Sequence, residues 1–202
     1  DEKIICMIKA NKFNYEYWDG NRRYGYGGYK YIPGRWRLAA DKLIRTYKLR
    51  SKSKILDVGC GKGFLLKEIK NLIPDIEVAG FDISKYAIKN SHPDIKKFIF
   101  YHDAKKKIPF KKNYFDFVIG FSAIYKYDLC NVIKTLKEID RVSKKSFITV
   151  ASYNDIKEKR LFEDWTLLGT TCLHKKEWIR LFKILKFKGD HYFTTPQSLN
   201  LC

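Results

Sequence analysis

Residues 54–66, with the sequence KILDVGCGKGFLL, decide the fold of this 202-residue chain. The apolar residues at positions 55, 56 and 58 indicate a short buried strand, and the apolar run from Phe64 onward indicates the start of a helix. Three glycines at alternate positions, Gly59, Gly61 and Gly63, separate the two elements. Glycine accepts positive φ and lets a ligand approach the backbone, and a helix start offers free N–H groups. The stretch therefore predicts a nucleotide-binding turn.

The glycine spacing differs from that of a dinucleotide site. That fingerprint requires G-x-G-x-x-G, but Phe64 stands where the third glycine should be. An acid, Asp57, stands near the end of the strand. A carboxylate there repels a pyrophosphate and suits a cationic ligand. A glycine turn without any ligand is the alternative that this stretch leaves open.

The pattern Asp-x-Gly-x-Gly-x-Gly resembles motif I of the class I methyltransferases, which bind S-adenosylmethionine. The resemblance implies that the glycine loop packs against the methionine part of the cofactor. It also implies that Asp57 bonds the amino group of the cofactor, directly or through water. S-adenosylhomocysteine would then be the product form.

Two further acids follow predicted strands. Residues 76–82 read as a second strand that ends in Asp82, about twenty residues after Gly63, where an acid can accept hydrogen bonds from ribose hydroxyls. Residues 98–101 read as a third strand, and the resemblance implies that Asp103 behind it bonds the adenine amine. The expected cofactor-binding residues are Asp57, Gly59, Cys60, Gly61, Gly63, Asp82, Ile83, Asp103, Ala104 and Phe121.

Strands and helices alternate along the rest of the chain. Helical spacing begins at Trp36 and returns after 84, over 129–139 and over 178–185, and apolar runs at 115–121, 146–152 and 192–194 indicate strands. The alternation predicts an α/β fold, a doubly wound and mostly parallel sheet with helices on both faces. The resemblance covers residues 36–195, within a cofactor-binding domain of residues 36–202. The family usually ends in a strand hairpin, and only one clear strand follows the last predicted helix, so the sheet is expected to be one edge strand short.

Residues 1–35 form an N-terminal segment rich in aromatic residues, arginine and glycine. Glycine spacing over 18–29 predicts an ordered loop. Tyrosine and arginine grip flat or anionic ligands, so the segment is a candidate lid or acceptor site. An aromatic strap packed over the domain is the alternative. The candidate acceptor residues are Tyr17, Arg22, Arg23, Tyr24, Tyr26 and Tyr29, joined by Tyr153 after the fifth strand.

Methyl transfer is an in-line displacement in which an enzyme mainly supplies geometry and excludes water. An amine or hydroxyl acceptor can require a base, and His174 and His102 are candidates because histidine titrates near neutral pH. Tyr125 could orient an acceptor. The candidate catalytic residues are therefore His174 and Tyr125, with a helix-capping surface histidine as the alternative for His174.

The cysteines and the net charge limit the cellular compartment and the kinds of partner that we expect. Five cysteines, at 6, 60, 130, 172 and 202, without a C-x-x-C pair, predict free thiols in a reducing, cytoplasmic setting, and no metal. No apolar run reaches the length of a membrane span. The formal net charge of +19 fits either an anionic partner or compositional bias with solvated lysines. The oligomeric state is not readable from the sequence.

The sequence also argues against several acceptors. Residues 120–123, Gly-Phe-Ser-Ala, differ from the Asp/Asn-Pro-Pro-Tyr of nucleic-acid amino methyltransferases, no Pro-Cys pair exists, and residues 121–128 lack the glutamates of protein-arginine methyltransferases. The segments at 18–29 and 172–178 resemble small bacterial methyltransferases associated with surface polysaccharide or sugar nucleotides. We therefore expect methyl transfer to a hydroxyl, amine or phosphate-type oxygen of a small anionic metabolite. The alternatives are an RNA-modifying or RNA-binding protein and a non-catalytic cofactor-binding module.

Overall fold

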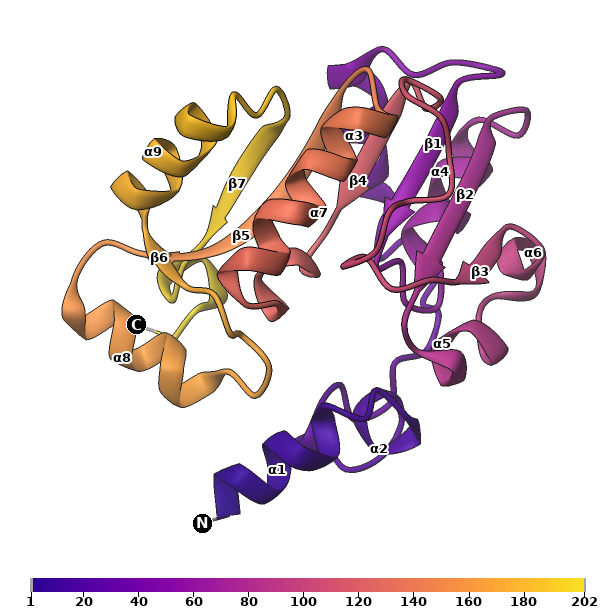
Figure 1. Ribbon diagram of the computed structural model, residues 1–202. Coiled ribbons are helices and arrows are strands. Elements are labelled where there is room, and N and C mark those ends of the chain that lie inside the picture. The colour runs from indigo at the N-terminus through magenta and orange to yellow at the C-terminus, as the bar shows by residue number, and fades with distance from the viewer. Residues whose placement is uncertain (1, 202) are drawn as a thin grey trace.

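The computed structural model describes residues 2–201, so Cys202 lies outside the described residues (Figure 1). Seven strands form one sheet in the order β3-β2-β1-β4-β5-β6, with β7 also paired to β5, and every strand pair is parallel. The strands are β1 Lys54–Val58, β2 Glu77–Asp82, β3 Ile99–Tyr101, β4 Phe117–Gly120, β5 Ser146–Tyr153, β6 Leu173–His174 and β7 Asp190–Thr194. The expected doubly wound, mostly parallel α/β fold is confirmed.

The sheet was expected to be one edge strand short, but it has seven strands within residues 2–201. β7 pairs with residues 147–151 of β5, and the two-residue β6 pairs with residues 152–153. The two short strands thus pair with successive parts of β5. No terminal hairpin forms within residues 2–201, because α9 (Lys175–Leu185) separates β6 from β7. The single strand expected after the last helix is β7, and β6 is the strand that sequence periodicity does not reveal.

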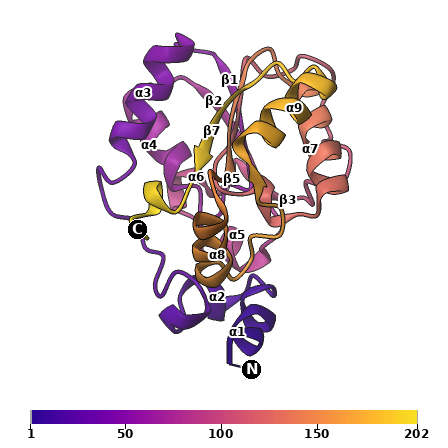
Figure 2. The ribbon, with the colours of Figure 1, turned by 90° about the vertical axis from the view of Figure 1, so that its left-hand side faces the viewer.

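Helices cover both faces of the sheet, as Figure 2 shows. On one face, α3 (Arg37–Tyr47), α4 (Phe64–Leu72) and α6 (Pro93–Lys96) pack over a cluster that includes Leu43, Ile55 and Ile69. On the other face, α7 (Leu129–Val142) and α9 pack over a cluster that includes Leu56 and Trp178. Successive residues of β1 therefore enter opposite clusters, as the pleat of a strand requires. The remaining helices of the domain are α5 (Lys85–Lys89), α8 (Ile156–Trp165) and the short helical turns η2 (Ile124–Lys126) and η3 (Gln197–Leu199).

The N-terminal segment is more helical than its glycine pattern predicts. It contains α1 (Glu2–Ala10), α2 (Tyr15–Trp18) and η1 (Arg22–Tyr24), joined by turns. Asn14 and Asn21 cap α2 and η1 by accepting hydrogen bonds from the backbone N–H of Glu16 and Arg23. Figure 1 shows the segment across the end of the sheet where the parallel strands finish. That edge is where open α/β sheets bind ligands.

None of the helices in residues 2–201 combines the length and the apolar character that crossing a membrane requires.

Candidate functional site

A cavity of about 890 Å³ lies between the carboxyl edge of the sheet and the N-terminal segment. The loops after β1, β2, β3 and β4 line its inner wall. The outer walls come from α1, from Trp18 and Tyr26, and from the loop that follows α8. Cavities that hold a drug-sized ligand measure about 300–1,000 Å³, so this one is large enough for a cofactor with a small acceptor beside it. Of the expected cofactor residues, the lining includes Gly59, Asp82, Ile83, Ala104 and Phe121.

Asp82 fixes the geometry of the glycine loop. Its Oδ2 accepts a hydrogen bond of 2.8 Å from the backbone N–H of Gly61, and its Oδ1 accepts one of 2.8 Å from the N–H of Ser84. Burial raises the pKa of Asp82, and these two backbone N–H groups oppose the rise. The carboxylate thus lies at the cavity wall with its position set by two charge-assisted bonds.

Glycine is required at the loop because the backbone is left-handed and crowded there. Gly59 has a φ of 74°, and a Cβ at this position would lie 2.5 Å from the Cβ of Ala123. Gly61 has a φ of 56°, and its Cβ would lie 2.8 Å from the indole of Trp18. The loop is therefore closely packed on both sides, against the chain after β4 and against the N-terminal segment.

Asp57 lies under this loop as a buried acid. Burial raises the pKa of Asp57 to about 7, and the neighbouring Asp82 adds to the rise. No hydrogen bond within residues 2–201 offsets this burial. Two buried acids without a cation between them suit a positively charged ligand. The two carboxylates therefore fit a ligand that carries an ammonium or sulfonium group.

The third expected acid is placed differently. Asp103 is absent from the cavity lining, and its Oδ1 accepts from the N–H of Lys105 at 3.0 Å. Its neighbour His102 lines the cavity with Nε2 buried and without a hydrogen-bond partner among residues 2–201. An unpartnered buried nitrogen is costly, so a bound ligand is a natural partner for it. Asp57, Cys60, Gly61 and Gly63 also lie outside the lining, and the side chain of Cys60 packs against Gly80 instead.

Three side-chain contacts tie the N-terminal segment to the cofactor edge. Lys62, inside the glycine loop, donates to both carboxylate oxygens of Asp19 at 2.7 Å, and its side chain is 5% exposed. The hydroxyl of Tyr86 donates to the same carboxylate at 2.8 Å. The indole Nε1 of Trp18 donates to Oγ of Ser84 at 2.8 Å. Sequence reasoning did not single out Asp19 or Lys62, although the lysine stands within the motif itself.

Lys126, at the end of η2, brings a cation to the cavity. Its ammonium donates to the hydroxyl of Tyr17 at 3.0 Å and lies 5.4 Å from the centre of that ring. Within residues 2–201 no carboxylate forms a salt bridge with it. Removal from water lowers the pKa of Lys126, but nearby Tyr26, Tyr125 and Asp82 outweigh that effect and the pKa is raised. The side chain therefore stays charged at the cavity wall.

The candidate acceptor residues separate into two groups. Tyr26 lines the cavity and stacks on Trp18, with 5.2 Å between ring centroids, while Tyr17 reaches it through Lys126. The other group bonds elsewhere. Arg22 donates to the carbonyl of Gly25, Arg23 pairs with Glu2, Tyr24 accepts from Lys9, Tyr29 stacks on Phe64, and Tyr153 packs edge-on against His174.

The candidate catalytic residues are not cavity-lining residues. His174 caps α9: its Nδ1 accepts from the N–H of Lys176 at 3.1 Å, and its Nε2 lies 3.0 Å from the carbonyl oxygen of Asn154. This is the helix-capping arrangement that the sequence left as the alternative. Tyr125 is buried, with its ring edge-on to that of Phe162. Of the two candidate histidines, His102 lines the cavity, with its Nε2 buried and its ring edge-on to that of Phe81.

Comparisons with known proteins agree with this geometry. A family model described as "Methyltransferase domain" matches residues 49–189. Over 96 residues the chain is 26% identical to malonyl-(acyl-carrier protein) O-methyltransferase of Bacillus anthracis, covering 46% of this chain and 36% of that protein. Over 131 residues it is 30% identical to an uncharacterized protein of Methanocaldococcus jannaschii, covering 63% of this chain and 49% of that protein. The alignments thus span less than half the length of these curated relatives.

A solved structure shares the fold. The YcgJ protein of Bacillus subtilis superposes with a TM-score of 0.61 at 18% identity, over 73% of this chain and 67% of that one. The matched family span contains the glycine loop, both buried acids and His102. Those residues fit a cationic nucleoside ligand, as their burial and their unpartnered groups indicate. The chain therefore belongs to the methyltransferase domain family, and its cofactor is S-adenosylmethionine.

Proposed function

We propose that this chain transfers the methyl group of S-adenosylmethionine to a hydroxyl, amine or phosphate-type oxygen of a small anionic metabolite. The observation that carries the proposal is the ammonium group of Lys126, which lines the cavity without a carboxylate partner among residues 2–201. Lys126 lies near enough to Asp82 for that acid to raise its pKa, but it forms no salt bridge within residues 2–201, and such a cation in a partly desolvated cavity favours an anionic ligand. A curated relative named as an O-methyltransferase supports oxygen as one of these acceptor atoms.

The cofactor supplies a methyl group on a positively charged sulfur, which an oxygen or nitrogen nucleophile can displace. The chain contributes binding, orientation and exclusion of water. Asp57 and Asp82 place negative charge at the cofactor edge, and Lys126 and Tyr17 hold the anionic group of the acceptor. His102 lines the same cavity and is the candidate base for a hydroxyl or amine acceptor.

In this proposal the N-terminal segment is the acceptor wall of the site and its lid. The support is that residues of α1, with Trp18 and Tyr26, line the cavity opposite the sheet. The segment also precedes the matched family span, which begins at residue 49. A wall supplied from outside the shared domain is a natural place for acceptor specificity, because loops and appended segments carry function on a rigid scaffold.

Replacing Lys126 by methionine tests the acceptor site. We expect kcat/KM for an anionic acceptor to fall at least about 30-fold, because losing a buried charge contact costs about 2 kcal/mol or more. S-adenosylhomocysteine affinity should stay within about threefold, since Lys126 faces the acceptor side. Methyl transfer would be measured on a panel of phosphorylated, carboxylated and nucleotide-linked metabolites, the last included because of the resemblance of residues 172–178.

The matched control is Lys134→Met on α7, which removes an exposed lysine far from the cavity lining. Equal losses in the two variants would mean that only net charge matters. Steeply salt-dependent binding of RNA by both, with no methylated metabolite, would favour the RNA alternative instead.

The raised pKa of Asp57 predicts proton release on cofactor binding. Below pH 7 this acid is largely protonated in the free protein, and the ammonium group of the ligand favours the carboxylate. S-adenosylhomocysteine binding should therefore release close to one proton at pH 6 and almost none above pH 8. Below pH 7, its affinity should increase by up to about tenfold for each unit by which the pH is raised. The effect on folding of the free protein has the opposite sign. Because the pKa of Asp57 is raised from 3.8 to about 7 in the folded state, the free energy of unfolding decreases as the pH rises from 3.8 towards 7.

Calorimetric titration in phosphate and in Tris, whose ionisation enthalpies differ, counts the released protons. Asp57→Asn is the control, because it keeps the shape but cannot titrate. Proton release that persists in this variant would assign the coupling to another group.

A further inference from the structure

One face of α1 is apolar, half-exposed and turned into the cavity. Ile4, Met7 and Ile8 line it, although they are 53%, 40% and 58% exposed, and Lys3 and Asn11 extend the same stripe. Their spacing of three and four residues places them on one side of the helix. Cys6 and Ala10 on another side are buried, and Ala10 packs in a cluster with Tyr17 and Trp18. The helix is therefore packed on one face and leaves its other apolar face to the cavity.

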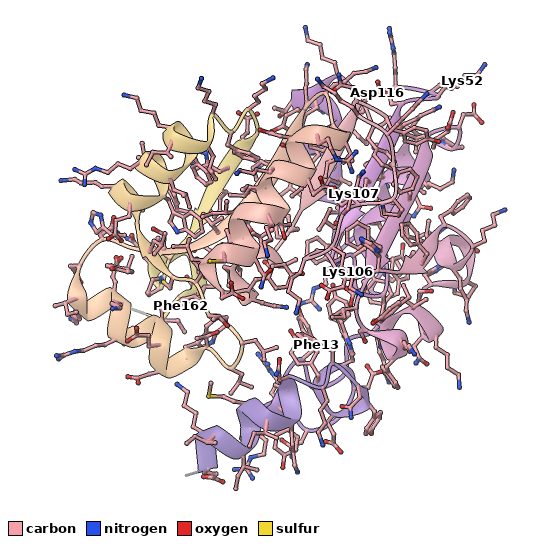
Figure 3. All side chains as sticks on the ribbon, viewed as in Figure 1. Phe13, Lys52, Lys106, Lys107, Asp116 and Phe162 are labelled. Atoms are coloured by element: carbon pink, nitrogen blue, oxygen red, sulfur yellow. The ribbon has the colours of Figure 1, made fainter. Side chains whose placement is uncertain are left out.

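The facing wall is apolar as well. Leu167 and Leu168, in the loop after α8, line the same cavity. Lys3 joins the two walls, because its ammonium donates to the backbone carbonyls of Glu163 and Asp164 at the end of α8. Figure 1 shows α1 below α8, and Figure 3 shows Phe13 between the N-terminal segment and the sheet. The outer part of the cavity thus has aliphatic side chains on both sides, with Glu163, Thr166 and Thr170 beside the two leucines.

The inner part of the same cavity has the opposite character. Lys126 and Tyr127 from the loop after β4, and His102 and Lys105 from the loop after β3, present polar and cationic groups there. The cavity therefore has Lys126 and Lys105 beside Asp82 at its inner end, and its exposed aliphatic side chains between α1 and the loop after α8. A large apolar surface left open within a cavity normally marks a ligand contact.

We propose that the acceptor is an amphipathic anion, a molecule with an acidic head and an aliphatic chain. Its head is held by Lys126 and its chain lies between Ile4, Met7 and Ile8 of α1 and the two leucines after α8. This inference rests on the proposed function for the position of the head and goes beyond it in naming the tail. An acceptor with a polar second half would leave Ile4, Met7 and Ile8 without an apolar partner.

The experiment uses straight-chain carboxylates as probes, with S-adenosylhomocysteine at saturation. Butanoate, hexanoate and octanoate are titrated calorimetrically into the wild-type chain. We expect Kd to fall about twofold to fourfold per added methylene, as burial of a methylene predicts. Octylamine, which carries the same tail on a cationic head, should bind at least about tenfold more weakly than octanoate.

Two matched variants distinguish the cavity-facing side chains of α1 from the other exposed side chains of the same helix. Met7→Gln/Ile8→Gln makes the cavity face of α1 polar, whereas Ile5→Gln changes an exposed isoleucine of the same helix that does not line the cavity. Glutamine is a good helix former, so α1 is retained in both. The double variant should lose most of the dependence on chain length, and Ile5→Gln should keep it.

The outcomes distinguish the inference from the function on which it rests. If affinity does not change with chain length in the wild type, the tail site is wrong. Loss of butanoate binding in Lys126→Met would then still support the anion site. If chain length matters but Lys126→Met leaves carboxylate binding unchanged, the head position is wrong, and with it both the proposed anion site and the amphipathic acceptor.

Discussion

Replacing Asp82 by alanine should weaken S-adenosylhomocysteine binding by at least about 100-fold. The carboxylate accepts from the N–H groups of Gly61 and Ser84 at 2.8 Å each, so its removal frees both ends of the turn that faces the cofactor. A hydrogen bond to a charged group contributes about 1.5–3 kcal/mol, and two of them exceed the 2.7 kcal/mol that corresponds to about 100-fold. The variant also lacks the acceptor expected for the ribose hydroxyls.

Asp116→Ala is the matched control, measured beside it by calorimetric titration. Asp116 also accepts from a backbone N–H, that of Lys54 at 2.9 Å, and pairs with Lys144 at 2.7 Å. Figure 3 shows it at the end of the sheet away from the N-terminal segment. It should therefore lose stability but keep cofactor affinity. Equal weakening in both variants would show that the loss follows from general destabilisation and not from the cofactor edge.

Gly59→Ala should cost about 3 kcal/mol of unfolding free energy and abolish measurable cofactor binding. Part of the cost, about 1–2 kcal/mol, comes from placing a Cβ on a left-handed residue. The rest comes from crowding, because the new Cβ would lie 2.5 Å from the Cβ of Ala123. Overpacking a well-packed site costs about 1–3 kcal/mol. Relief of the contact would push the loop after β4 into the cavity that both residues line.

Gly34→Ala isolates the backbone part of this cost. Its φ of 78° is close to that of Gly59, but a Cβ there would meet nothing within 4 Å. Urea unfolding should show a loss of about 1–2 kcal/mol for this control, with cofactor binding retained. If the two glycines gave the same stability loss, contact with Ala123 would not be the reason for glycine at position 59.

The sheet and the cofactor edge were predictable because their signals are local. The strand at 54–58, its glycines and the acids at 57 and 82 stand in short motifs whose geometry follows from strand direction and turn conformation. The loop after β4 shows the limit of such signals. Its position at the ligand edge was expected, but the aim of Lys126 into the cavity depends on η2, a turn without any periodic pattern.

The N-terminal segment and the tail region were harder to predict. Tertiary packing stabilises α1, since a nine-residue helix is marginal alone, and its β-branched isoleucines are weak helix formers. The arginines at 22 and 23 suggested an anion grip, yet they bond within the segment. Composition reveals that aromatic and cationic groups gather there, but not the direction in which each side chain points. The sequence also did not predict α8, because this helix buries only Phe162 and its apolar periodicity is weak.

The ion pair between Lys62 and Asp19 crosses the border of the shared domain. Lys62 stands within residues 49–189, and Asp19 stands before them. The pair therefore attaches the N-terminal segment, which lines the outer side of the cavity, to the matched methyltransferase domain. Grafting residues 1–35 onto a relative would have to carry a lysine into that relative's glycine loop as well. Otherwise Asp19 would lose the ammonium group that binds both of its carboxylate oxygens.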